Sequence, residues 1–212
     1  MNKKWKRILM TVYVLVLILM LSTATFAYFS MIQVTTLSPQ VQAESAVTDW
    51  LIFSTGDPIN IEATEENFGE DMGDISGRTY GGALLQVSDS SKEVSYNYNV
   101  ILNIVENEFV YTTPTEEVEL LLKVTDPDGM EVTNIPGLVY KDVTNGNGEV
   151  LRGFDITTKV GNYYIANNYE ITSNLQTQHI WNVEVILVNL DSDQNANAGK
   201  VVDAYLEVSK GE

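Results

Sequence analysis

Residues 94–104 read VSYNYNVILNI, and this stretch decides the class of fold. Apolar or aromatic side chains occupy every second position from Val94 to Ile104, and Ser or Asn occupies four of the five positions between them. Because successive side chains of a strand point to opposite faces of a sheet, this alternation predicts a strand with one face in a core.

The same two-residue period recurs in residues 118–124, 180–188 and 202–208. Each run therefore predicts a further strand with one apolar face. Beyond the N-terminal region only residues 42–49 have a pattern that would suit a short helix. The sequence thus predicts an all-β domain.

In two of these runs the alternation predicts whether a particular side chain is exposed or buried. In residues 118–124 the polar face holds Glu119, which we expect to face solvent. In residues 180–188 the apolar face holds Trp181, which we expect to be buried, whereas Ile186 and Val188 make both faces apolar near the end of the run.

Turn signals separate the predicted strands. The sequences DPDG at 126–129 and NGNG at 145–148 are typical turns, because Pro presets a turn φ and Gly accepts a positive φ. Residues 69–82 are acidic and rich in glycine and are expected to form a long surface loop. The sequence has no internal repeat and no interdomain linker, which indicates a single domain. The pattern of strands and turns predicts a jelly-roll or Greek-key β-sandwich of about eight to ten strands.

The N-terminal region has the order of a secretory signal peptide. A basic segment at residues 3–7 precedes an uncharged apolar run that ends in small and polar residues. Thr25 and Ala27 suit the specificity positions of a signal peptidase, so we expect cleavage between Ala27 and Tyr28. Residues 1–27 are then the signal peptide and residues 28–212 a single extracellular domain.

An uncleaved membrane anchor is the alternative for this region. The uncharged stretch at 8–29 exceeds the roughly 20 residues that a membrane-spanning helix needs. Positive charges on its N-terminal side would keep that end in the cytoplasm. Either interpretation places residues 28–212 outside a bacterial cell, with membrane contact only through the N-terminal segment.

The charge balance and the absence of cysteine exclude several kinds of site. The chain has 12 Lys and Arg against 29 Asp and Glu, a net charge of −17, and no cysteine. Such an acidic surface repels the phosphates of nucleic acids. Without cysteine there is no thiolate nucleophile and no Cys-zinc site.

No enzymatic activity, cofactor or metal site is predicted. His179 is the only histidine, and no G-x-S-x-G sequence supplies a nucleophile for it, so we interpret it as a histidine with a satisfied structural hydrogen bond. The loop at 191–199 has Asp191, Asp193 and Asn195 at the first, third and fifth positions of a calcium loop. It lacks the glycine and the final glutamate of that motif, which favours a polar turn and leaves calcium binding open.

Tyrosines are numerous, and several lie close together in the sequence. Clustered tyrosines would suit stacking on sugars in a surface-binding module, although tyrosine is also favoured in strands for packing. The candidates are Tyr96, Tyr98, Tyr163, Tyr164 and Tyr169. An adhesin or carbohydrate-binding module is therefore the alternative function.

The sequence TFAYFS at 25–30, at the end of the apolar run, resembles precursors of the TasA/camelysin family. These are secreted biofilm-matrix proteins of Gram-positive bacteria that a SipW-type signal peptidase processes. The resemblance implies a jelly-roll domain and self-association, or association with related matrix proteins, in extracellular fibres. It also implies that residues 28–37 form a strand donated to the next subunit. Camelysin-type members have been described as metalloproteases, but no HExxH sequence is present here, so that activity is not carried over.

Overall fold

The computed structural model describes residues 49–68, 73–190 and 192–212. All of them belong to one compact unit, residues 40–212. The predicted leader at 1–27, the cleavage site between Ala27 and Tyr28, the segment 28–37 and all of the candidate helix except its last residue lie outside the described residues. Among the residues that are described, no helix is long and apolar enough to cross a membrane.

The described part of the chain is all-β, as the alternating runs predict. Two short 3-10 helices, Glu65–Asn67 and Asn195–Asn197, interrupt the strands. The strands are β1 (Trp50–Thr55), β2 (Ile59–Glu62), β3 (Ile75–Gln86), β4 (Val94–Asn107), β5 (Leu120–Thr125), β6 (Val139–Thr144), β7 (Val150–Asp155), β8 (Gly161–Ser173), β9 (Gln176–Leu187) and β10 (Val201–Lys210).

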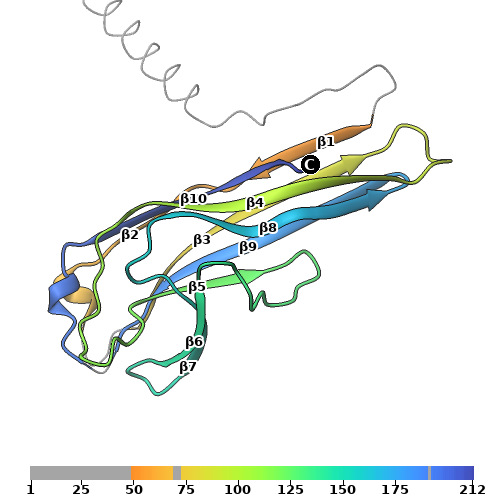
Figure 1. The fold of residues 1–212 in the computed structure, drawn as a ribbon. Coiled ribbons are helices and arrows are strands. Elements are labelled where there is room, and N and C mark those ends of the chain that lie inside the picture. Colours follow the sequence, from red (N-terminus) through yellow and green to blue (C-terminus); the bar gives the residue numbers. More distant parts are fainter. Residues whose placement is uncertain (1–48, 69–72, 191) are drawn as a thin grey trace, which may run out of the picture. The chain divides into compact units, whose positions relative to one another are not determined.

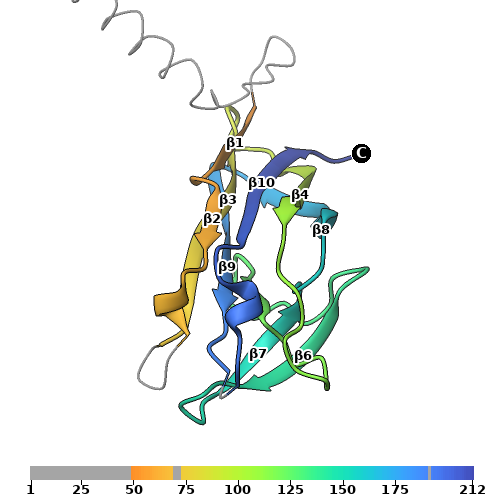
Figure 2. The same cartoon turned by 90° about the vertical axis from the view of Figure 1, so that its left-hand side faces the viewer.

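The strands form two antiparallel sheets, seen face to face in Figures 1 and 2. Sheet A has the order β1-β3-β9-β5-β7-β6, and sheet B has the order β2-β10-β4-β8. Consecutive strands alternate between the two sheets except at β5, β6 and β7, which stay in sheet A. The main core fills the space between the sheets and includes Tyr98, Leu102, Leu122 and Trp181.

The prediction of a surface loop at 69–82 is wrong from Ile75 onward, because β3 begins there. This strand pairs with β9 along its whole length. Its glycines allow the sheets to approach closely. A Cβ at Gly77 would lie 2.7 Å from Ile59 Cγ2, and one at Gly81 would lie 3.0 Å from Val208 Cγ2.

A second apolar cluster lies on the outer face of sheet A. It contains Val118, Leu121, Val143, Leu151, Ile186, Val188 and Leu190. The β6–β7 ribbon supplies two of these side chains and runs across the direction of the long strands (Figure 1). This cover explains why residues 180–188 become apolar on both faces near their end, since each face packs in a different core.

Close contact between the β6–β7 ribbon and β5 depends on Gly153. A Cβ at this position would lie 2.5 Å from the carbonyl oxygen of Leu122 and 3.0 Å from Leu121 Cγ. Backbone cannot yield as a flexible side chain can, so we expect Gly153→Ala to lower the free energy of unfolding by about 1–3 kcal/mol. Urea denaturation measures this. Gly73→Ala is the matched control, because a Cβ there meets nothing within 4 Å; equal stability of the two variants would contradict the prediction.

Candidate functional site

The first strand is the sheet edge best suited to pair with another chain. Among the described strands β1 forms one edge of sheet A and pairs only with β3, in continuous register from Trp50 to Thr55. Its sequence, WLIFST, has no charge, no proline and no bulge. An edge strand with these properties offers unpaired backbone groups to a further strand, and proteins usually block such edges.

The other edges carry features that hinder strand addition. β8, an edge of sheet B, is longer but has irregular register with β4 near Val100, and Asn168 there has a φ of 50°. A bulge of this kind bends an edge and limits pairing. Of the remaining edges, β2 has only four residues and β6 is as long as β1, and both include charged residues.

A hydrogen-bonded chain of three aromatic side chains lies between the two sheets. Trp181 Nε1 donates to Tyr98 Oη at 2.9 Å, and Tyr98 Oη lies 2.9 Å from His179 Nδ1. Because the indole N–H can only donate, the tyrosine hydroxyl accepts from Trp181 and still has its own proton to donate. A neutral imidazole with its proton on Nε2 accepts that proton at Nδ1. Tyr169 packs edge-on against Trp181, with ring centroids 5.0 Å apart.

The surroundings of His179 favour its neutral form. Burial lowers the pKa of His179 below its usual value, although attraction to Asp128 opposes this shift. Burial also raises the pKa of Tyr98, so its hydroxyl keeps the proton that it donates. With Tyr98 and Trp181 deep in the core, the arrangement agrees with the interpretation of His179 as a structurally bonded histidine.

The low pKa of His179 predicts that stability falls in mild acid. Below about pH 6.5 the unfolded chain binds a proton on this histidine more readily than the folded protein does, so the free energy of unfolding should decrease as the pH falls through that value. We expect His179→Gln, which keeps an acceptor for Tyr98, to remove this part of the pH dependence. Urea midpoints at pH 7.5 and 5.5 test it, and parallel profiles for the two proteins would contradict it.

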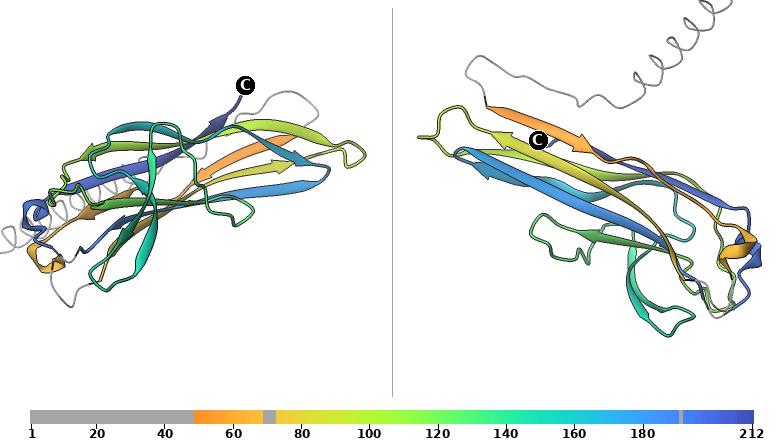
Figure 3. Two further views of the ribbon diagram at one scale, coloured as in Figure 1. Left: turned by 60° about the horizontal axis from the view of Figure 1, so that its bottom comes forward. Right: turned by 180° about the vertical axis from the view of Figure 1, so that it is seen from behind.

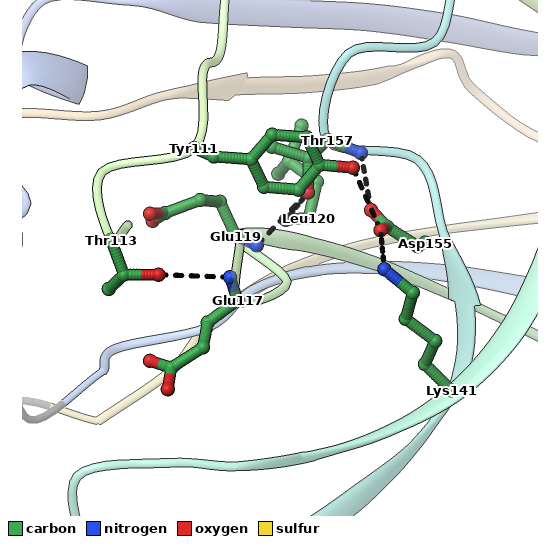
Figure 4. A network of polar contacts seen from close by, with 8 residues as sticks. All are labelled: Tyr111, Thr113, Glu117, Glu119, Leu120, Lys141, Asp155 and Thr157. Atoms are coloured by element: carbon green, nitrogen blue, oxygen red, sulfur yellow. Dashed lines mark hydrogen bonds and ion pairs between the residues drawn. The ribbon is translucent and has the colours of Figure 1, made fainter. Parts of the chain in front are cut away.

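A buried polar network surrounds Glu119, contrary to the prediction that this residue faces solvent. Glu119 is fully buried. Its carboxylate accepts hydrogen bonds from the backbone N–H of Thr112 at 2.9 Å, from the Thr112 hydroxyl and from Gln194 Nε2. Its backbone N–H donates to Thr157 Oγ1 at 3.0 Å (Figure 4). The network ties β5 to the chain segments before it and before β10.

A second carboxylate, Asp155, lies close by but is bound separately. In Figure 4 the Glu119 carboxylate points away from Asp155, and no dashed line joins the two side chains. Asp155 accepts from Lys141 Nζ at 2.7 Å and from Tyr111 Oη at 2.8 Å. Burial alone would raise the pKa of Asp155, but the hydrogen bonds from Lys141, Thr157 and Tyr111 outweigh it and hold the pKa below its usual value. Burial and the carboxylate raise the pKa of Tyr111 to about 12. The arrangement suits a structural ion pair.

The loop proposed as calcium-like is fixed by amide side chains. Gln194 accepts from the backbone N–H of Leu190 at 2.7 Å, and Asn197 is bonded to both backbone groups of Val110. Asp193 accepts from the backbone N–H of Asn195, which is a local turn. Asp191 lies outside the described residues. Over 49–68, 73–190 and 192–212 no group of three or more His, Asp or Glu side chains is placed to hold a metal ion.

The clustered tyrosines have different environments. Tyr98 is fully buried and Tyr169 packs against it, so these two belong to the core. Tyr164 remains 45% exposed on β8. The structure therefore does not bring the five tyrosines considered for the alternative of sugar stacking into one surface. Sequence comparison finds no matching model of a known protein family and no matching curated protein.

Proposed function

We propose that this chain is a secreted or surface-displayed structural protein, a subunit or accessory of extracellular matrix fibres or of the cell envelope. The observation that carries the proposal is the uncharged, regular edge at β1, which residues 38–49 join to the segment 28–37. The resemblance of residues 25–30 to TasA/camelysin precursors supports it. The alternation of consecutive strands between two sheets supports a jelly-roll-related fold.

Residues 28–37 are the segment proposed to join one copy to the next. Their sequence, YFSMIQVTTL, is rich in strand-forming residues and carries no charge. It can therefore enter a sheet without burying an ionised group. Added beside β1 of a second copy, it would extend sheet A by one strand and satisfy the backbone groups along that edge. Other copies, or related matrix proteins, are the partners on this proposal.

Export provides the setting for this association. A signal peptidase would remove residues 1–27 and leave Tyr28 as the first residue of the donated strand. The assembled protein would then lie outside the cell or on its surface. It would have no nucleic-acid partners. Only its precursor would contact the membrane, through the N-terminal segment. No catalytic step is part of the proposal.

Deletion of residues 28–37 tests the proposal. We expect the deleted protein to fold, to form no fibres by electron microscopy at any concentration, and to bind the added peptide 28–37. Ile52→Lys, which places a charge on the β1 edge, should also prevent fibres. Tyr164→Lys on the β8 edge is the matched control and should leave assembly intact. If deletion unfolds the domain while the undeleted protein stays monomeric, the strand completes its own domain and the proposal fails.

A further inference from the structure

Over β1, β3 and β9, away from the second apolar cluster, the outer face of sheet A is mostly exposed in the part of the chain that the structure describes. Strand register places four successive rows of side chains on this face, and Figure 3, right, shows the three strands side by side. The rows are Trp50, Gln86 and Gln176; Ile52, Leu84 and Gln178; Ser54, Gly82 and Ile180; and Tyr80 with Asn182. In this subsection and below, the outer face of sheet A means these eleven residues and excludes the part that the second apolar cluster occupies.

This outer face combines exposed rings with amides and has no charge. Trp50 is 47% exposed at one end and Tyr80 is 43% exposed at the other, with Ile180 40% exposed between them. The first ion pair, Arg78 with Glu184 at 2.8 Å, lies one row beyond Tyr80. Although the chain has a net charge of −17, none of these eleven residues is Asp, Glu, Lys, Arg or His.

The dimensions of the outer face suit a narrow partner. Three strands by seven residues cover roughly 14 Å by 24 Å, or about 340 Å², at ordinary strand spacings. A stable protein interface buries about 800 Å² on each partner, so the face is too small for a second copy of this chain to dock on it alone. It does fall within the range of patches that are often functional on a monomer.

We propose that the outer face of sheet A binds a neutral polysaccharide chain. Trp50 and Tyr80 lie about 20 Å apart along the sheet, from their register six residues apart on β3, so one chain of several sugars would contact both rings. Aromatic faces bury the apolar sides of sugars, while Gln86, Gln178 and Asn182 offer amide donors and acceptors to hydroxyl groups.

Charge selects the class of polysaccharide. The acidic surface of the protein repels polyanions, whereas an uncharged chain pays no electrostatic penalty on an uncharged face. In the third row, position 82 has no side chain to rise between Ser54 and Ile180, and a Cβ there would lie 2.7 Å from Ser54 Oγ. An open sheet face accommodates an extended polymer better than a single small ligand, which binds in a concave site.

The test measures retention of the full chain, kept in mild detergent, on cellulose, chitin and starch, with polygalacturonate as the acidic polymer. We expect retention on at least one neutral polymer and none on polygalacturonate. Trp50→Ala and Tyr80→Ala should each weaken retention at least tenfold, with an unchanged melting temperature because both side chains are exposed. Tyr164→Ala and Tyr205→Ala, exposed aromatics of sheet B, are the matched controls and should bind normally.

Two outcomes would overturn the inference. The first is retention on none of the neutral polymers. The second is retention that Trp50→Ala and Tyr80→Ala leave unchanged; if these two variants also lose self-association, the outer face belongs to contacts with a second copy. Fibre formation is read separately by electron microscopy, so a failure of strand exchange does not affect this result.

Discussion

Replacing Trp181 with alanine should remove about 3–5 kcal/mol from the free energy of unfolding. The indole is only 3% exposed and lies between the two sheets, so the substitution leaves a large cavity. It also removes the N–H donated to Tyr98 Oη and the ring against which Tyr169 packs. Against a typical stability of about 5–15 kcal/mol, the loss would leave many molecules unfolded at moderate temperature.

Urea denaturation followed by circular dichroism measures the effect of Trp181→Ala. Trp50→Ala is the matched control: the same residue type, 47% exposed, should cost no more than about 0.5 kcal/mol. Trp181→Phe separates two contributions, since it fills most of the volume but cannot donate to Tyr98. Equal stability of the Trp181→Ala and Trp50→Ala proteins would mean that the core does not depend on this ring.

The position of Trp181 could be predicted because alternation within one strand is a local signal. The same basis predicts strands at Val94–Ile104 and at residues 202–208, and both lie in strands of sheet B with most of their alternating apolar side chains buried and the rest partly buried. Local alternation reports which face of a strand is apolar. It does not report what packs against the opposite face, which is why Glu119 was wrongly expected to face solvent. The wrong prediction of a loop over β3 has a different cause.

At β3 the misleading signal was glycine, which is common in loops but also permits close approach of strands. The sequence around Gly77 and Gly81 gives no sign that Ile59 and Val208, far away in the chain, require that space. The hydrogen-bond partner of His179 could not be predicted either, because Tyr98 lies 81 residues earlier in the chain. The sequence favoured a structural hydrogen bond for this histidine but did not indicate which residue forms it. The β1 edge and the outer face of sheet A likewise depend on strand order, which alternation leaves open.

Glu119 shows this limit most clearly, and its removal should have the second largest effect. The residue lies in an alternating run between Val118 and Leu120, where a charged side chain ordinarily faces water. Its carboxylate instead accepts from Thr112, seven residues before it, and from Gln194, 75 residues after it. Gln194 is itself buried and bonded to the backbone of Val188 and Leu190.

We expect Glu119→Ala to lower the free energy of unfolding by about 3 kcal/mol or more, because it leaves the part-buried donors of Thr112 and a buried N–H of Gln194 without an acceptor. Glu119→Gln keeps the volume of the side chain but turns an N–H toward one of these donors. It should therefore lower the free energy of unfolding, although by less than Glu119→Ala does. Glu117→Ala, an exposed carboxylate two residues away, is the control and should change stability by less than about 0.5 kcal/mol. Urea midpoints of the four proteins decide the order, and a Glu119→Ala protein as stable as Glu117→Ala would show that the buried network does not stabilise the fold.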